Sequence, residues 1–134
     1  MKTLKILLAA SILMGNMAAK DRASVLLSQV LPKLDGEHVK VFLVEVNYGP
    51  GEASKPHTHG CAVVGYIVAG ALRTQVKGEA EKTYHAGESF YEAPNGIHQV
   101  SANASSTEPA KFVAYMICDH DTPLSTEIPE SSGK

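Results

Sequence analysis

From Gly36 onward the chain alternates short apolar, β-branched runs with turn-forming Gly, Pro and Asn residues. The runs that predict strands cover residues 39–46, 63–68, 72–76, 83–85, 89–93, 97–101 and 112–118. Many short strands separated by turn signals, without a long amphipathic helix, are typical of an all-β sandwich or barrel. We therefore expect one domain over residues 36–118, with a polar loop at 102–111 and a partly ordered tail at 119–134.

The first 19 residues have the three-part pattern of a secretory signal peptide. Lys2 and Lys5 precede an apolar run at residues 6–14, and the small residues Ala18 and Ala19 follow it. The run is too short for an ordinary transmembrane helix, so we prefer an export signal to a buried helix, an uncut anchor or a lipoprotein. Export predicts a periplasmic or secreted protein.

Residues 20–35 are predicted to form a linker, with an apolar helical turn or arm that Pro32 interrupts. Loss of residues 1–19 would remove two of the 12 basic residues and none of the 14 acidic ones, which leaves a net charge of −4. The scattered basic residues and the negative charge argue against nucleic-acid binding. After the signal, no apolar stretch is long enough to cross a membrane.

Three histidines carry most of the functional information in this sequence. His57 and His59 are two residues apart, so on an extended strand both imidazoles point to the same face. His98 follows the Pro-Asn-Gly turn at residues 94–96, which can swing its side chain toward the other two. Three neutral imidazoles suit a divalent transition metal and leave coordination positions open, so we predict a metal site on His57, His59 and His98.

The segment from Gly51 to His59, followed by Gly70, resembles the first motif of the cupin superfamily. Gly87 and the sequence Pro-Asn-Gly-Ile-His ending at His98 resemble its second motif. The resemblance implies a cupin double-stranded β-helix, which is a jelly-roll barrel, with His57 and His59 from one strand and His98 from an opposing strand. It also implies a divalent metal, which we expect to be Fe, Zn, Mn, Ni or Cu, and a homodimer.

The sequence departs from the cupin pattern at the glutamate ligand of the first motif. Val63 and Val64 occupy its two usual positions, and between Asn47 and Glu79 the only carboxylate is Glu52. Some cupins that resemble this pattern hold iron with three histidines, including certain thiol, diketone and gentisate dioxygenases. We therefore expect three neutral nitrogens without a carboxylate, a charge arrangement that favours anionic oxygen ligands.

Other polar side chains on the predicted strands are candidates for substrate contacts. These are Tyr66, Arg73, Gln75 and Tyr91, with Gln99 and Tyr115 as further barrel-lining candidates, although packing and solvent exposure are the more usual roles of such residues. His38, His85 and His120 are expected to be exposed and not to bind metal. Cys61 and Cys118 can form a disulfide in an exported protein, but we favour the alternative in which both pack as small apolar residues.

Three functions are compatible with these features, because a fold does not fix a function. The first is a metal-dependent oxygenase for a small anionic or enolisable substrate. The second is a cupin that binds or senses a small ligand or metal without turnover. The third is a non-redox metalloenzyme such as a lyase or isomerase. The sequence does not name a general base for any of them.

Overall fold

The computed structural model describes residues 23–129, and within this range it contains ten β-strands and no helix. The strands are β1 (Lys40–Tyr48), β2 (Ala53–Ser54), β3 (His57–Thr58), β4 (Ala62–Ala69), β5 (Ala71–Val76), β6 (Lys82–His85), β7 (Ser89–Glu92), β8 (Ile97–Asn103), β9 (Ala110–Cys118) and β10 (Thr126–Glu127). All seven strands predicted from the hydrophobic pattern are present, with bounds that differ by at most two residues. The all-β prediction is confirmed.

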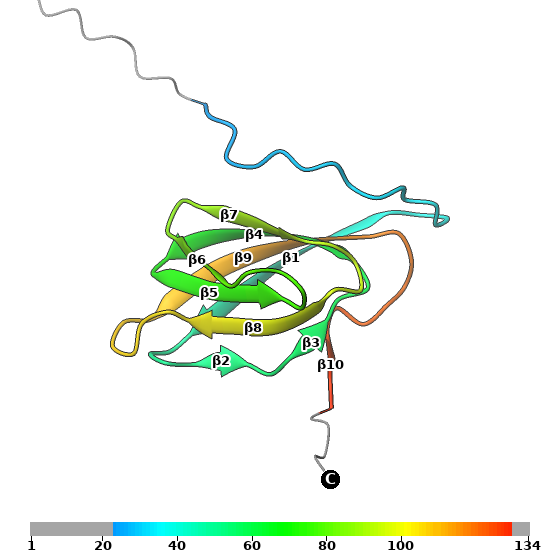
Figure 1. Ribbon diagram of the computed structural model, residues 1–134. Helices are drawn as coiled ribbons and strands as arrows, with labels where there is room; N and C mark the ends of the chain where they lie inside the picture. The colour runs from blue at the N-terminus through cyan, green and yellow to red at the C-terminus, as the bar shows by residue number, and fades with distance from the viewer. Residues whose placement is uncertain (1–22, 130–134) are drawn as a thin grey trace, which may run out of the picture.

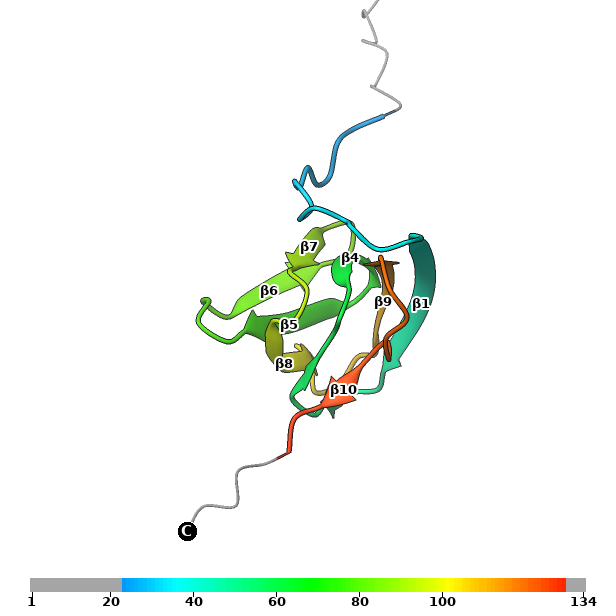
Figure 2. The same cartoon turned by 90° about the vertical axis from the view of Figure 1, so that its right-hand side faces the viewer.

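The strands form two antiparallel sheets that face each other (Figure 1). One sheet has the order β1-β9-β4-β7, and the other has the order β10-β3-β8-β5-β6, with β2 also pairing with β8. Strands adjacent in space are mostly distant in sequence, as expected for a jelly-roll barrel. Figure 2 shows the two sheets as opposite walls, with the C-terminal segment and β10 near one open end.

The core lies between the two sheets and follows strand alternation. Alternate residues of β4 and β9 point inward and are buried, while their neighbours point outward. The main core side chains are Tyr48, Val63, Ile67, Leu72, Phe90, Phe112 and Met116. Gly65 on β4 is part of this packing, because a Cβ there would lie 2.1 Å from Cε1 of Phe90. The Phe90 ring therefore occupies the space that any larger residue at position 65 would need.

Cys61 and Cys118 form a disulfide, so our preferred interpretation of two independently packed cysteines was wrong. Both residues are buried in the core, as that interpretation expected. Pairing in the sheet explains the bond: Ala62 on β4 is opposite Ile117 on β9, which places the adjacent cysteines side by side. The bond ties the segment that carries His59 to the end of β9.

The segments on either side of the barrel differ from the sequence expectation. Residues 23–35 form an arm without regular secondary structure, so the helical turn considered for this region is absent. Within the segment expected to be a partly ordered tail, β10 pairs with β3. The predicted signal peptide at residues 1–19 lies outside the described residues. In residues 23–129 no helix has the length and apolar character needed to span a membrane.

Candidate metal centre

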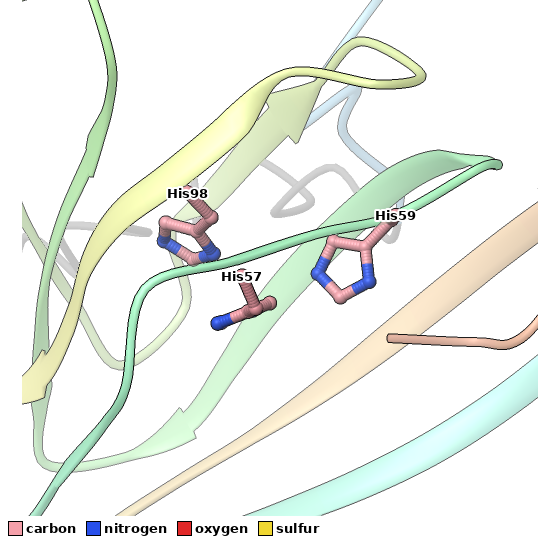
Figure 3. A group of neighbouring side chains, drawn as sticks. All are labelled: His57, His59 and His98. Carbon is pink, nitrogen blue, oxygen red and sulfur yellow. The ribbon is translucent and has the colours of Figure 1, made fainter. Parts of the chain in front are cut away.

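The three predicted histidines converge at one end of the barrel (Figure 3). His57 on β3 is the direct cross-strand partner of His98 on β8, and His59 follows β3. All three residues are buried, and one ring nitrogen from each lies within 4.8 Å of the other two. Strand pairing and the two-residue spacing together produce the common direction that the sequence predicted.

Each histidine is held through one ring nitrogen and offers the other. Nδ1 of His57 donates to the carbonyl oxygen of Lys55 at 2.7 Å, and Nδ1 of His59 donates to that of Leu124 at 2.5 Å. Nε2 of His98 lies 2.6 Å from Oγ1 of Thr74, while its Nδ1 is buried and finds no hydrogen-bond partner among residues 23–129. Hydrogen bonds of this kind fix the tautomer and orientation of metal-binding histidines.

One turn and the C-terminal segment position His59 against the rest of the site. Asn95 adopts a left-handed conformation with φ 63°, which Asn tolerates better than most residues, and its N–H donates to the carbonyl oxygen of His59 at 2.7 Å. Gly60 lies against the C-terminal segment, since a Cβ there would be 2.6 Å from Oγ1 of Thr122. The second-motif turn and the C-terminal segment thus both support His59.

A carboxylate lies beside the histidines, although the group of side chains with metal-ligand spacing consists of the three imidazoles alone, as expected. Glu92 on β7 is buried, with Oε1 3.2 Å from Nδ1 of His98 and Oε2 3.8 Å from Nε2 of His59. Its cross-strand partner is Val63, one of the two positions at which a cupin glutamate was expected. The motif pattern covers the chain just after His59, whereas sheet pairing brings Glu92 from the neighbouring strand.

Burial sets the protonation of these groups. Desolvation, followed by the charges of His57 and His59, lowers the pKa of His98 to about 4, and desolvation also lowers the pKa of His59. Both imidazoles are therefore neutral at pH 7, which is the form that binds metals. Burial, with a smaller contribution from Glu79, raises the pKa of Glu92 to about 7. Because His98 is neutral at this pH, its close contact with Glu92 is not an ion pair.

The histidines face a cavity of about 470 Å³ that opens between the two sheets. One wall is apolar and comes from β1 and β9, with Val44, Val46, Phe112, Ala114 and Met116. Another part carries the hydroxyl groups of Tyr48, Ser54 and Ser101, which hydrogen-bond to one another. Leu124, Ser125 and Glu127 of the C-terminal segment complete the rim. The cavity can hold a small molecule with both polar and apolar parts.

Comparison with known proteins identifies the family. The model of the cupin domain family matches residues 44–118, which is more than half of the chain. The chain belongs to the cupin family. The jelly-roll fold inferred from the two histidine motifs is thereby confirmed. No curated protein sequence is significantly similar to this cupin.

Solved structures with this fold carry several different activities. Oxalate oxidase in complex with the substrate analogue glycolate is 23% identical with a TM-score of 0.55, over 66% of this cupin and 46% of that chain. The DMSP lyase DddQ from Ruegeria pomeroyi is 15% identical with a TM-score of 0.54, over 66% and 42%. The polyketide cyclase RemF from Streptomyces resistomycificus is 16% identical with a TM-score of 0.56, over 69% and 63%.

These likenesses support the fold alone. This cupin spans between 42% and 63% of the length of those chains, and the sequence identities are low. An oxidase, a lyase and a cyclase share the barrel, so the reaction has to be inferred from the site residues.

The donor set fits a divalent transition metal. Three nitrogen atoms converge from rings that are otherwise held in place, and Nδ1 of His98 is a buried polar atom without a partner, which a bound cation would satisfy. Imidazole ligands suit iron, zinc, copper and nickel, and an adjacent carboxylate also suits manganese. His38, His85 and His120 are exposed, as expected, and lie outside this group.

The structure does not bring the four candidate substrate residues to the histidines. Tyr66 and Tyr91 alternate with inward-facing residues on β4 and β7, so their side chains leave the sheet on its outer face. Arg73 is exposed and lies 3.5 Å from Glu81, and Gln75 accepts a hydrogen bond from Gln99. None of the four lines the histidine cavity. Strand register, which the sequence left open, decides these directions.

The sequence patterns did not identify the hydroxyl groups at the site, which come from Tyr48, Ser54, Thr74 and Ser101, nor two further contributors. One is Glu92, which lies two residues after Phe90 on the same strand. Because a strand residue two positions from a core aromatic residue faces the core, this spacing could have indicated that Glu92 points inward. The other is the C-terminal segment, whose Leu124 carbonyl holds His59. No sequence pattern marked that carbonyl, since any residue supplies one.

Proposed function

We propose that this cupin binds one divalent transition metal on His57, His59 and His98 and acts on a small anionic or enolisable substrate, with oxygenase chemistry as the favoured reaction. The observation that carries the metal site is the convergence of three buried imidazoles within 4.8 Å on a cavity of about 470 Å³. When bound, the metal would supply Lewis-acid or redox chemistry at its open coordination positions.

The walls of the cavity suggest the substrate class. An oxyanion would bind at the cationic, histidine-lined end, because metal charge is strongest there. The hydroxyl groups of Tyr48, Ser54 and Ser101 can accept or donate hydrogen bonds to a polar substituent, and the apolar wall can pack against a short hydrocarbon part. A small carboxylate, diketone or related enolisable compound has this distribution of polar and apolar groups.

The metal site can be tested by elemental analysis of protein purified without added metal. Wild-type protein should retain close to one equivalent of iron, zinc, manganese, nickel or copper, and His57→Ala should retain much less. His85→Ala is the matched control, since the His85 side chain is 70% exposed and lies away from the cavity. Unchanged metal content in His57→Ala would show that the ligand assignment is wrong.

Turnover needs a separate measurement on the metal-loaded protein. Iron-loaded protein should consume oxygen with at least one member of a panel of small diketones, thiols and aromatic diols, and His98→Ala should not. Oxygen consumption by none of them would contradict the oxygenase proposal. The remaining functions would then be a binding or sensing cupin, or a non-redox lyase or isomerase.

We also propose that the mature protein is exported to the periplasm or secreted, and that it forms a homodimer. The signal-like N-terminus supports export, and the Cys61–Cys118 disulfide is consistent with an oxidising compartment. Val41, Leu43 and Tyr115 expose apolar surface on the outer face of the β1-β9-β4-β7 sheet, which supports pairing with a second copy. Fractionation with mass spectrometry of the mature N-terminus tests export, and gel filtration with light scattering tests the dimer.

A further inference from the structure

Glu92 has no structural partner that explains its burial. The residue is 5% exposed, although carboxylates are almost never buried unless they are paired or bind a cation. Among residues 23–129 no lysine or arginine forms an ion pair with it, and its carboxylate makes no hydrogen bond there. Within the described residues, its contacts with basic groups are those with the rings of His59 and His98.

The distances place this carboxylate within reach of an ion bound by His59 and His98. Oε1 is 3.2 Å from Nδ1 of His98, and Oε2 is 3.8 Å from Nε2 of His59. Metal–ligand bonds are about 2.0–2.1 Å to imidazole nitrogen and about 2.0–2.2 Å to carboxylate oxygen, so one nitrogen and one oxygen on the same ion lie at most about 4.3 Å apart. Both separations fall below that limit.

The contact with His98 also suggests a cation between the two groups. Nε2 of His98 is engaged by Thr74, which leaves Nδ1 as the nitrogen on the Glu92 side. That Nδ1 atom is buried and has no hydrogen-bond partner in the described part of the chain, despite the carboxylate oxygen at 3.2 Å. The two atoms are close but do not satisfy each other by a hydrogen bond, and a shared cation would bond to both.

We propose that Glu92 is a fourth ligand of the metal, supplied by β7 instead of by the strand that carries His57 and His59. The inference rests on the metal site of the proposed function. Val63 on β4 and Glu92 on β7 are cross-strand partners, so their side chains start from neighbouring positions on the inner face. One carboxylate reduces the formal charge of a 2+ ion to 1+, which strengthens metal retention and still favours an anionic substrate.

The test compares Co²⁺ binding to metal-free wild-type protein and to Glu92→Gln, by chelator competition and by visible absorption of the bound Co²⁺. Loss of a direct ligand should weaken binding at least as much as loss of a supporting hydrogen bond, so we expect the Kd to rise about 100-fold or more. The absorption spectrum should also change, because the number and type of ligands determine it. Circular dichroism establishes that the variant is folded.

Two controls separate this proposal from the metal site itself. Glu88→Gln makes the same substitution on an exposed carboxylate four residues earlier, and it should leave the Kd and spectrum unchanged. His57→Ala should abolish binding. If His57→Ala abolishes binding while Glu92→Gln keeps the wild-type Kd and spectrum, the Glu92 proposal fails and the histidine site stands. If His57→Ala has no effect, the histidine site fails.

An exchange across the strand pair provides a second test. Glu92→Val alone should lose Co²⁺ affinity as Glu92→Gln does, and adding Val63→Glu should restore it by returning a carboxylate from the opposite position. A folded exchange variant that binds Co²⁺ no more tightly than Glu92→Val would contradict a carboxylate ligand on this strand pair.

Discussion

Removal of the Cys61–Cys118 disulfide should destabilise the protein strongly. The two cysteines are separated by 57 positions, so the bond closes a long loop in the unfolded chain. The loop-closure relation gives about 4 kcal/mol of stabilisation for a loop of this length. For a domain of this size, that corresponds to a fall in Tm of roughly 15 °C.

The assay is thermal and urea unfolding of the metal-free protein with and without reductant, beside the double variant Cys61→Ala and Cys118→Ala. Reduction should lower the stability of wild-type protein to near that of the double variant, which should itself be insensitive to reductant. The reduced protein should also bind metal less tightly, because Cys61 is two residues from His59. Equal stability of oxidised and reduced wild-type protein, or two free thiols in unfolded, unreduced protein, would refute this reasoning.

Three further predictions concern packing, the C-terminal segment and pH. Gly65→Ala should lower the free energy of unfolding by about 1–3 kcal/mol in urea titrations, because its Cβ would lie 2.1 Å from the Phe90 ring. Truncation after Thr122 should raise the Kd for Co²⁺ about 10–100-fold, because Nδ1 of His59 loses its carbonyl partner. Burial raises the pKa of Glu92 from 4.5 to about 7, so ionisation of this group between pH 4.5 and 8 should cost metal-free protein about 3 kcal/mol of stability. The lowered pKa of His98 acts in the opposite direction over the same range, so the Glu92 contribution is measured as the difference between wild type and Glu92→Gln. Glu92→Gln should remove the cost of ionisation. The free energy of unfolding of the variant should exceed that of wild type by about 3 kcal/mol at pH 8 and should equal it at pH 4.5.

Each of these predictions has a matched control. A Cβ at position 49 would lie 3.4 Å from its nearest atom, Oε2 of Glu52, so Gly49→Ala should have little effect on the free energy of unfolding. Equal losses of stability in Gly49→Ala and Gly65→Ala would argue against the proposed clash with Phe90. Removal of residues 130–134 alone should not change the Kd, since Leu124 and β10 remain. Glu88→Gln should not reproduce the pH-dependent stabilisation. An unfolding free energy of Glu92→Gln that parallels wild type across this pH range would exclude a buried, destabilising carboxylate.

The alternation of apolar and polar residues was sufficient to predict the strands. Seven runs of apolar residues between Gly, Pro and Asn turns became seven strands, because period-two patterns and turn residues are local properties. The two-residue strands β2 and β10 were not predicted, since their pairing partners lie far away in the chain and two residues carry no periodicity. A strand at β3 was expected only from the histidine motif. Likewise, two isolated cysteines did not reveal the pairing that β4 and β9 impose on them.

The histidine positions were also predictable, because a two-residue spacing fixes a shared face and the Pro-Asn-Gly turn at residues 94–96 marks the approach of His98. The outward directions of Tyr66 and Tyr91 could not be predicted, because they depend on the register of strand pairing. A shift of the register by one residue moves every side chain of a strand to the opposite face of the sheet.

By itself, then, the sequence determined an all-β barrel with three histidines directed to one place. Only the tertiary structure decided what surrounds them: Glu92 from β7, the Leu124 carbonyl from the C-terminal segment and the disulfide beside His59. The physical reason is that faces and turns follow from residues close in the chain, whereas the neighbours of a site follow from strand pairing. That pairing joins Val63 to Glu92 across 29 positions of sequence, and no local pattern records it.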